Sequence, residues 1–424
     1  MTTLSGRSID DFEPIHRSRP GADELAGASA REAQQVAPGV WMSPGLTNSY
    51  LLTTDDGRIV VNTGMGFESP VHKANFDAVD DGTVRYIIYT QGHADHVGGT
   101  DVFREPGTHI VAQANWEMWR DDTDRLLAHR ARNTMFAFVD KISATVAGIQ
   151  ERFGQVLPAQ AAPDPDIIVE DTLSLELGGR RIELIATPGG ETTDSLVVWL
   201  PDERICLCGN LFGPVFGHIP NLVTMRGDRY RDALVAVASY ERVRQLQPEV
   251  LITGHFEPIQ GAARINAELI RLRDAVQFLH DETVTAMNAG DDVRDAMAAI
   301  TLPPELEVGQ GYGKVSWNVR AIWENYNGWF HRRSTTELYP VGPESISSDL
   351  VELAGSDALV ERAGRLLAAG EPLRAIHLGE IVFNADPDNQ RARSVLRAAH
   401  EVLLGQSTNF WESAWLRKQI GELA

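Results

Sequence analysis

The sequence predicts the α/β fold class, with an all-helical region at the carboxyl end. Short apolar runs separated by glycine- and aspartate-containing turns fill residues 40–260, and long helix-forming segments follow them. The length of 424 residues also exceeds the ~250–300 residues at which one hydrophobic core stops growing. The predicted divisions are an amino-terminal arm over residues 1–35, an α/β domain over 36–262 with a helical insertion over 115–155, a helical extension over 263–345 and a helical domain over 346–424.

Composition and charge exclude several classes of protein. A content of 43% hydrophobic and 23% charged residues is ordinary for a globular protein. No window approaches the ~20 apolar residues that span a bilayer, and Met1–Ala26 lacks the apolar core of a signal peptide, so we expect no membrane span and a cytoplasmic location. The net charge of −21 argues against nucleic acid and anionic membranes as partners. Cys206 and Cys208 lie two residues apart in one apolar segment, which places them poorly for a disulfide.

The first half of the chain reads as strands with a few helices. The arm is expected either to extend over a neighbouring subunit or to form a disordered tail. Asp55-Asp56-Gly57 between two β-rich runs is a strong hairpin signal. The expected elements are strands over Val40–Met42, Asn48–Thr53, Arg58–Gly64, Val84–Tyr89 and His109–Ala112, and helices over Ser69–Asp77 and Asp101–Arg104.

The segment from Asn115 to Gln155 is helix-prone and rich in aromatic residues. It could form a lid that supplies an apolar pocket, or it could simply pack over the edge of the sheets. The strands Ile167–Glu170, Leu173–Leu177 and Arg181–Ala186 are expected to begin a second sheet. Further strands follow over Ser195–Leu200, Ile205–Cys208 and from Val250, with helices over Arg231–Leu246 and Ala263–Met287.

A polar cluster directly follows the strand that ends at Tyr89. Gln91, His93, Asp95 and His96 lie in Gln-Gly-His-Ala-Asp-His-Val-Gly-Gly, and two imidazoles and a carboxylate at the end of a strand can converge on one point, as a metal site requires. Alternatively, the segment is an ordinary loop whose polar residues cap a helix.

This spacing resembles the His-x-His-x-Asp-His motif of the metallo-β-lactamase superfamily, with Gln91 in place of the first histidine. The resemblance implies an αββα sandwich. The turn Thr187-Pro188-Gly189-Gly190-Glu191 resembles the alkylsulfatase branch, in which a glutamate replaces the usual histidine ligand. His255, in Thr253-Gly254-His255, matches the last metal ligand of the family, and Asn210 stands where a carboxylate usually bridges two metal ions.

The resemblance implies two metal positions. Gln91, His93 and Glu191 would surround one ion, and Asp95, His96 and His255 the other. An amide oxygen is a weaker zinc donor than imidazole, and a neutral Asn210 removes the bridging charge. We therefore expect one or two zinc ions with weakened or altered occupancy, either a single zinc or a harder ion such as manganese or iron.

Pro220–Gly227 resembles the alkylsulfatase segment whose asparagine and arginine hold the sulfate group. Carried over, Asn221 and Arg226 would recognise an anion, because a guanidinium offers a planar fork of donors to a tetrahedral oxyanion. Alternatively, Arg226 is a structural residue packed in a turn. Asp95 could also orient the water that the metal converts to a bound hydroxide near neutral pH.

The last ~80 residues read as helix pairs, with Asp386-Pro387-Asp388-Asn389 as a turn between helices over Pro372–Phe383 and Gln390–Leu404. This pattern looks like tetratricopeptide-type packing and is similar to the dimerisation domain of alkylsulfatases. We expect a homodimer or higher oligomer, or a hetero-oligomer with a homologous subunit, and no sterol-carrier-like domain of the kind found in longer relatives.

Two functions fit these residues. The first is a metallohydrolase that uses a metal-bound hydroxide on a small organic sulfate ester, or a related activated ester or ether, with an apolar portion. The second is a catalytically degenerate subunit that binds or supports an active partner. Loss of two ligands favours the second, and retention of the other matching positions favours the first.

Overall fold

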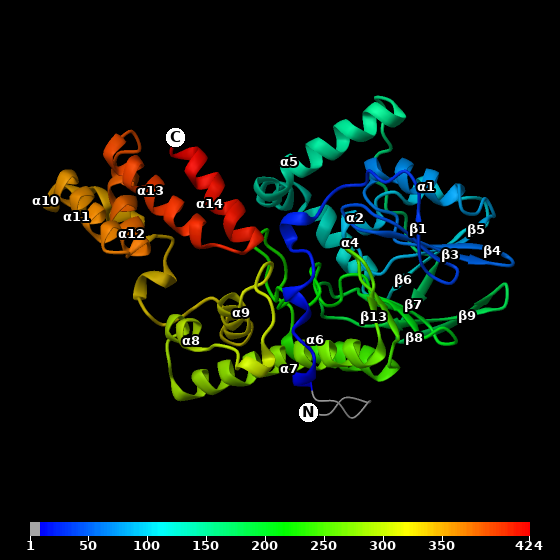
Figure 1. Cartoon of the computed structure of the whole chain (residues 1–424). Coiled ribbons are helices and arrows are strands. Elements are labelled where there is room, and N and C mark those ends of the chain that lie inside the picture. Colours follow the sequence, from blue (N-terminus) through cyan, green and yellow to red (C-terminus); the bar gives the residue numbers. More distant parts are fainter. Residues whose placement is uncertain (1–8) are drawn as a thin grey trace. The chain divides into compact units, whose positions relative to one another are not determined.

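The computed structural model describes residues 9–424 (Figure 1). Its contacts divide the chain into one unit that ends at Asn325 and a second that comprises Tyr326–Ala424. The predicted limits at residues 35, 262 and 345 stay predictions. Residues 1–8 of the predicted arm lie outside the described part of the chain.

The described part of the arm packs on its own chain. It contains three short 3₁₀ helices, η1 (Ile9–Asp11), η2 (Ile15–Arg17) and η3 (Ala22–Glu24). Ile9 is buried against Ala267 and Ile270 of the long helix α7 (Ala262–Ala289). Burial of such apolar side chains fixes the course of the arm before the first strand begins at Gln34.

A seven-stranded sheet has the order β1-β2-β3-β4-β5-β6-β7. Its first four strands pair antiparallel, and β4 to β7 pair parallel. The predicted hairpin is confirmed, since β3 and β4 are joined at Asp55 and Asp56. The strands are β1 (Gln34–Ala37), β2 (Val40–Ser43), β3 (Ser49–Thr54), β4 (Gly57–Val61), β5 (Val84–Ile88), β6 (His109–Gln113) and β7 (Ile167–Val169).

A six-stranded sheet has the order β13-β12-β11-β10-β9-β8. Its strands are β8 (Thr172–Leu177), β9 (Arg180–Ala186), β10 (Leu196–Leu200), β11 (Ile205–Leu207), β12 (Val250–Ile252) and β13 (Ile259–Gln260). The prediction that residues 167–170 open this sheet is wrong, because β7 pairs with β6 of the first sheet, with Ile167 opposite Val111. Such a parallel pairing requires a long crossover, and the closeness of β7 to β8 along the chain gives no sign of it.

The two sheets face each other across a common core. Tyr50 and Leu52 of β3 point into this core, whereas Leu51 between them packs on the opposite face of its sheet. In β10, Val198 likewise faces the core and Trp199 faces outward. This alternation is the period of two that a β-strand imposes on its side chains.

Helices cover both outer faces and complete the αββα sandwich, which confirms the predicted fold class (Figure 1). Phe76 of α1 and Trp116 of α4 pack on the first sheet, and Tyr240 of α6 packs on the second. Cys206 and Cys208 are buried free thiols of the second sheet. The helices are α1 (Ser69–Asp77), α2 (Ala94–Val97), α3 (Thr100–Phe103), α4 (Trp116–Arg125), α5 (Leu127–Phe153), α6 (Ala233–Leu246), α8 (Val293–Ala299) and α9 (Val315–Asn327), with 3₁₀ helices η4 (Gly66–Glu68) and η5 (Pro304–Leu306).

The second unit is built from helices alone. Ala363, Leu366, Ala375 and Ala399 pack together where α11, α12 and α13 meet, so small residues let these helices approach closely. The elements are η6 (Thr335–Leu338), η7 (Pro343–Ile346), α10 (Ser347–Ala354), α11 (Ser356–Ala368), α12 (Pro372–Ala385), α13 (Gln390–Gln406) and α14 (Phe410–Glu422). Within residues 9–424, none of the helices combines the length and the apolar character needed to cross a bilayer.

Candidate metal centre

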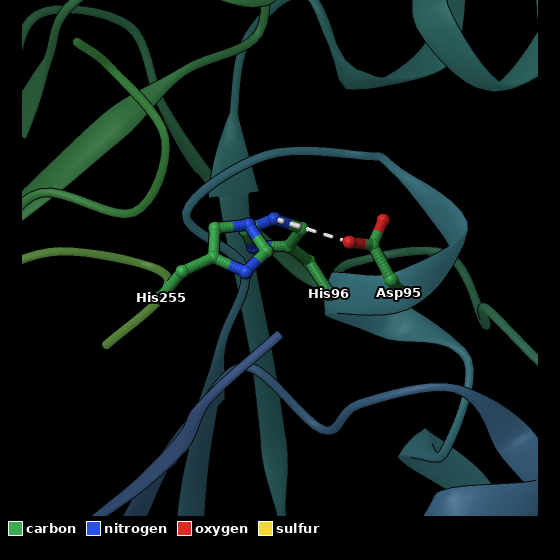
Figure 2. A group of neighbouring side chains, drawn as sticks. All are labelled: Asp95, His96 and His255. Atoms are coloured by element: carbon green, nitrogen blue, oxygen red, sulfur yellow. Dashed lines mark ion pairs between the residues drawn. The ribbon is translucent and has the colours of Figure 1, made fainter. Parts of the chain in front are cut away.

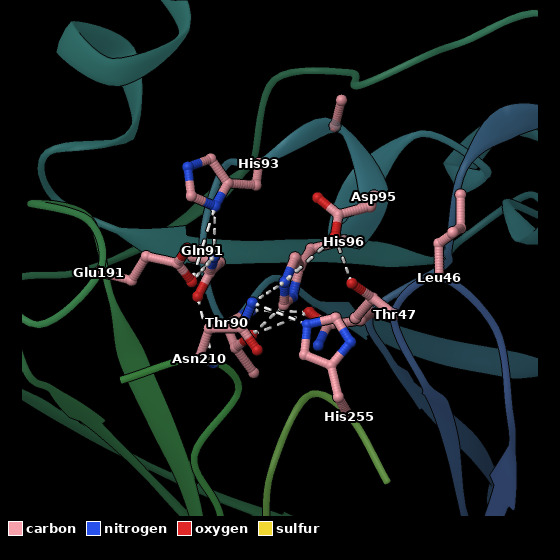
Figure 3. A network of polar contacts seen from close by, with 12 residues as sticks. Leu46, Thr47, Thr90, Gln91, His93, Asp95, His96, Glu191, Asn210 and His255 are labelled. Atoms are coloured by element: carbon pink, nitrogen blue, oxygen red, sulfur yellow. Dashed lines mark hydrogen bonds and ion pairs between the residues drawn. The ribbon is translucent and has the colours of Figure 1, made fainter. Parts of the chain in front are cut away.

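The polar residues expected to bind metal come from the ends of strands in both sheets. The loop after β5 carries Gln91 and His93 and leads into α2, which holds Asp95 and His96. Turns after three strands of the second sheet carry the others: Glu191 after β9, Asn210 after β11 and His255 after β12. Figure 3 shows these side chains converging in one place, as the sequence predicts.

Asp95, His96 and His255 form the tightest group of potential ligands. One ligand atom from each of the three residues lies within 4.8 Å of the other two (Figure 2). The side chain of His96 is fully buried, and that of His255 is nearly so. Two imidazoles and one carboxylate are a donor set typical of catalytic zinc sites, in which the fourth position stays open. The residues present therefore fit a divalent metal ion.

The side-chain amide of Asn210 contacts both imidazoles, and a bound ion would take its place at their Nε2 atoms. The side-chain nitrogen of Asn210 lies 3.1 Å from Nε2 of His96 and 3.1 Å from Nε2 of His255, so it donates to both. His96 therefore carries its proton on Nδ1, which lies 3.4 Å from the hydroxyl of Thr90. That hydroxyl donates to Oδ1 of Asn62 at 3.1 Å. An outer partner of this kind fixes the tautomer and orientation of a metal-binding histidine.

The protonation states also suit metal binding. Burial lowers the pKa of His96, and it lowers the pKa of His255 to about 4, so both imidazoles are neutral near pH 7. Burial alone would raise the pKa of Asp95, but the neighbouring His96 and His255 and a hydrogen bond from the hydroxyl of Thr47 lower it. Asp95 is therefore an ionised carboxylate.

The residues of the other expected metal position contact one another. The backbone N–H of Asn210 donates to Oε1 of Gln91 at 3.2 Å, which turns the amide nitrogen of Gln91 toward His93 and Glu191. This nitrogen lies 2.6 Å from Nδ1 of His93 and 3.5 Å from Oε2 of Glu191. The amide of Gln91 thus occupies the ligand atoms that would face the first ion.

The electrostatic surroundings of His93 and Glu191 differ from those of Asp95, His96 and His255. Burial, together with the charges of Arg226 and Arg231, lowers the pKa of His93 well below its ordinary value. Burial raises the pKa of Glu191, although the same two arginines oppose this effect. Compared with the Asp95 group, this position has an amide in place of an imidazole, which makes it the weaker metal site.

Arg226 lines the cavity beside the metal group, whereas Asn221 does not. Nη2 of Arg226 donates to Nε2 of His93 at 2.6 Å, which leaves the proton of this neutral imidazole on Nδ1, and lies 3.9 Å from the buried carboxylate of Asp228. Asn221 is buried, and its side-chain oxygen and nitrogen have no hydrogen-bond partner among the described residues. Its carbonyl oxygen accepts from Arg231 at 2.5 Å. Of the predicted anion-binding pair, Arg226 alone lines the cavity beside the metal group.

This cavity has a volume of about 190 Å³. Its polar lining consists of the side chains that surround the metal group, and its apolar lining comes from segments far apart in the sequence. The polar and charged lining residues are His93, Asp95, Thr134, Glu191, Asn210, Arg226 and His255, and the others are Leu25, Leu46, Met65, Ala94, Phe138, Ile142, Pro214 and Tyr312. Thr134, Phe138 and Ile142 belong to α5, so the predicted helical insertion contributes a wall of the cavity.

Sequence reasoning missed several residues that shape the site. Thr47 and Thr90 position Asp95 and His96, and Arg231 places a second buried cation beside Glu191. Of these three residues, only Thr90 could be suspected from the sequence, because it directly precedes Gln91 of the motif. Thr47 and Arg231 stand in segments without a pattern of their own, and only the folded chain brings them to the motif.

Comparison with known protein families agrees with this geometry. Residues 42–255 match the family model of the metallo-beta-lactamase superfamily, and residues 292–423 match that of the alkyl sulfatase dimerisation family. A linear primary-alkylsulfatase of Pseudomonas is 27% identical over 393 residues, which cover 86% of this chain and 72% of the relative. An alkyl/aryl-sulfatase of Saccharomyces cerevisiae is 29% identical, over 78% of this chain and 54% of the relative.

Solved structures share the fold. The structure of an inverting sec-alkylsulfatase of Pseudomonas superposes with a TM-score of 0.80 at 21% identity, and the match covers 100% of this chain and 72% of the other. The chain thus spans between about half and three-quarters of the length of these relatives.

Proposed function

This chain belongs to the metallo-β-lactamase superfamily, and from that premise we propose that it is a metal-dependent hydrolase of small organic sulfate esters or related activated esters and ethers. One observation carries the proposal: Asp95, His96 and His255 form a potential metal-binding group, and Asp95 and His255 line the same cavity as Arg226. The names of the relatives, which are alkylsulfatases, support the choice of a sulfate ester.

A divalent ion bound by these three ligands would supply Lewis acidity and lower the pKa of a water molecule from about 15.7 to about 7. The chain itself provides the remaining functions. Asp95, held by Thr47, would orient the attacking water, and Arg226 would bind the sulfate oxygens through charge-assisted hydrogen bonds. Asn221 does not line the cavity, so its part in anion recognition stays an expectation from the resemblance. The apolar walls of the cavity would receive the organic portion of the substrate and exclude bulk water.

We propose that one ion, most simply zinc, is the working metal. Single occupancy is supported by the amide of Gln91, which contacts His93 and Glu191 and is a weaker metal donor than the histidine of the family pattern. Manganese and iron accept oxygen ligands more readily than zinc does, so either ion is the alternative to zinc. We also propose a homodimer, consistent with the match to a dimerisation family, and the cytoplasmic location stays a prediction.

A degenerate, partner-supporting subunit is the second candidate. It is favoured by the neutral side chains of Gln91 and Asn210, which remove two charged or imidazole ligands of the family pattern. Against it stands the intact hydrogen-bond chain from Asn62 through Thr90 to His96, which a site without metal does not need.

Elemental analysis of the purified protein, together with hydrolysis of alkyl and aryl sulfates and activated aryl esters and ethers, separates these candidates. The proposal predicts about one metal equivalent per chain, and loss of both metal and turnover in His96→Ala. His377→Ala, an exposed histidine of the second unit, is the matched control and should retain both. A protein that binds no metal and turns over no substrate after reconstitution would support the degenerate subunit instead.

A further inference from the structure

The amino-terminal arm reaches the cavity beside the metal group. Leu25, which directly follows η3, is buried and lines this cavity together with Phe138 and Ile142 of α5. The arm is far from these residues in sequence, yet it supplies part of the same apolar wall. Figure 1 shows the dark-blue arm reaching the neighbourhood of α1 and α5.

Two basic side chains of α5 hold the arm in this place. Nζ of Lys141 donates to the carbonyl oxygens of Asp23 and Leu25 at 2.6 and 2.7 Å. Arg152 donates to the carbonyl of Ala30 at 2.8 Å. Gly27 packs so closely on α5 that an added Cβ would lie 2.0 Å from the hydroxyl oxygen of Thr145, so the arm and the helix touch at this point.

A buried carboxylate joins the arm to two further parts of the wall. Oε1 of Glu68 accepts from the backbone N–H groups of Ala28 and Leu46 at 2.8 and 2.9 Å, and Oε2 accepts from that of Met65 at 3.3 Å. Leu46 and Met65 line the cavity themselves. One side chain therefore fixes three wall segments relative to one another, and Leu25 lies three residues from the anchored Ala28.

We propose that the arm is a specificity element of this cavity, in which Leu25 limits the length of the alkyl chain that can bind. The inference rests on the proposed function for the nature of the substrate, an amphiphilic anion. Leu25, Phe138 and Ile142 then contact the alkyl chain while Arg226 faces the anionic group. Lys141 and Glu68 are positioning residues that act through the arm and do not touch the substrate.

The test measures binding of n-alkylsulfonates of six to twelve carbons, which cannot be hydrolysed as sulfate esters, to the full-length protein by calorimetry. Leu25→Ala removes three carbon atoms from the wall and makes room for about two more methylenes of the ligand. The ratio of affinities for dodecanesulfonate and hexanesulfonate should therefore rise about tenfold over the wild type. Leu25→Phe should shift the preference the other way. Ser29→Ala, on an exposed residue of the same arm, is the control and should leave the ratio unchanged.

Lys141→Met tests the anchoring without changing the wall itself. It should shift the preference toward longer chains, as Leu25→Ala does, and melting temperatures identify any variant that has lost its fold. Leu25→Val, which removes a single carbon atom, then provides the wall variant that folds, and it should shift the ratio in the same direction as Leu25→Ala. Equal ratios in the wild type and in folded Leu25 variants overturn the proposal, as does failure of every sulfonate to bind.

Turnover of the matching alkyl sulfates separates this inference from the proposed function. Sulfonate binding that follows the Leu25 variants, without hydrolysis of any sulfate, would support the arm as a specificity element and contradict the hydrolase. Hydrolysis with a chain-length preference that no Leu25 variant changes would support the hydrolase and overturn the role of the arm in specificity.

Discussion

The backbone N–H of Asn210 donates a 3.2 Å hydrogen bond to the side-chain oxygen of Gln91. These are the two positions at which the sequence departs from the metal-binding pattern of the family, and they contact each other. The bond orients the Gln91 amide toward His93 and Glu191, while the Asn210 side chain donates to His96 and His255. The two departures therefore act as one unit, in which two amides replace a histidine and a carboxylate and contact ligands of both expected ions.

Reversing both departures should therefore restore a second metal ion. We expect Gln91→His with Asn210→Asp to bind about two zinc equivalents per chain, because an imidazole and a bridging carboxylate replace two neutral amides. Either change alone should leave about one equivalent. Elemental analysis after dialysis against zinc is the measurement. Two equivalents in the wild type, or one in the double variant, would contradict this account of Gln91 and Asn210.

Thr90 should influence metal affinity without touching the metal. Thr90→Val keeps the shape of the side chain but removes the hydroxyl that accepts from Nδ1 of His96. Loss of such an outer partner weakens metal binding about 10- to 100-fold. Chelator competition measures the change in dissociation constant. Thr283→Val, which removes a buried hydroxyl from α7, is the matched control and should retain wild-type affinity.

The guanidinium of Arg226 should not be replaceable by an amine. We expect Arg226→Lys to lower kcat/KM for a sulfate ester about 100-fold, because lysine keeps the charge but loses the planar fork of donors. Metal content should stay the same, since Arg226 contacts His93 and not the Asp95 group. The measurement is steady-state kinetics of Arg226→Lys. Arg181→Lys, on the surface, is the control. Unchanged kinetics would assign Arg226 a structural role in its turn.

Glu68 should make stability depend on pH near neutrality. Burial raises its pKa to about 7, although three backbone N–H groups oppose the shift. Because the folded pKa lies above the ordinary value of 4.5, the folded state retains the proton longer, and the free energy of unfolding falls as pH rises from about 4.5 to 7. The loss is at most about 3 kcal/mol.

Denaturant unfolding of the wild type and Glu68→Gln at pH 5 and pH 8 tests this prediction. The amide cannot ionise, so the free-energy difference between the two proteins should change between these pH values, with the wild type losing more stability at pH 8. A constant difference would mean that the three hydrogen bonds keep Glu68 ionised throughout.

Local patterns in the sequence predict most of the fold. Alternation of apolar residues and the Asp55-Asp56-Gly57 turn predict the strands that form the hairpin, and the apolar run before Gln91 predicts β5. The parallel pairing of β7 with β6 could not be predicted, because it is decided by tertiary packing after the long excursion through α4 and α5. Local periodicity contains no information about such a partner.

The candidate site likewise contains residues that the sequence predicts and residues that it does not. Residues inside recognisable motifs, such as His96 and His255, converge as expected. Residues that act through backbone contacts, such as Glu68 and Leu25, have no sequence signal, because a carboxylate that accepts backbone N–H groups requires no particular neighbour in the chain. The sequence also does not predict how the Gln91 amide is oriented, because its direction is set by a hydrogen bond from the backbone of Asn210.

The second unit should mediate dimer formation, as its match to a dimerisation family leads us to propose. Trp329, Tyr339 and Leu353 expose 70%, 62% and 85% of their surface, so this unit offers large apolar side chains to a partner. We expect light scattering to give the mass of two 46.6-kDa chains for the wild type and of one chain for Trp329→Glu with Leu353→Glu, because a buried unpaired carboxylate strongly opposes association. His377→Glu, a charged change on an exposed helical residue of the same unit, controls for surface charge and should remain dimeric. A monomeric wild type, or a dimer that survives both glutamates, would place the subunit contact elsewhere or remove it.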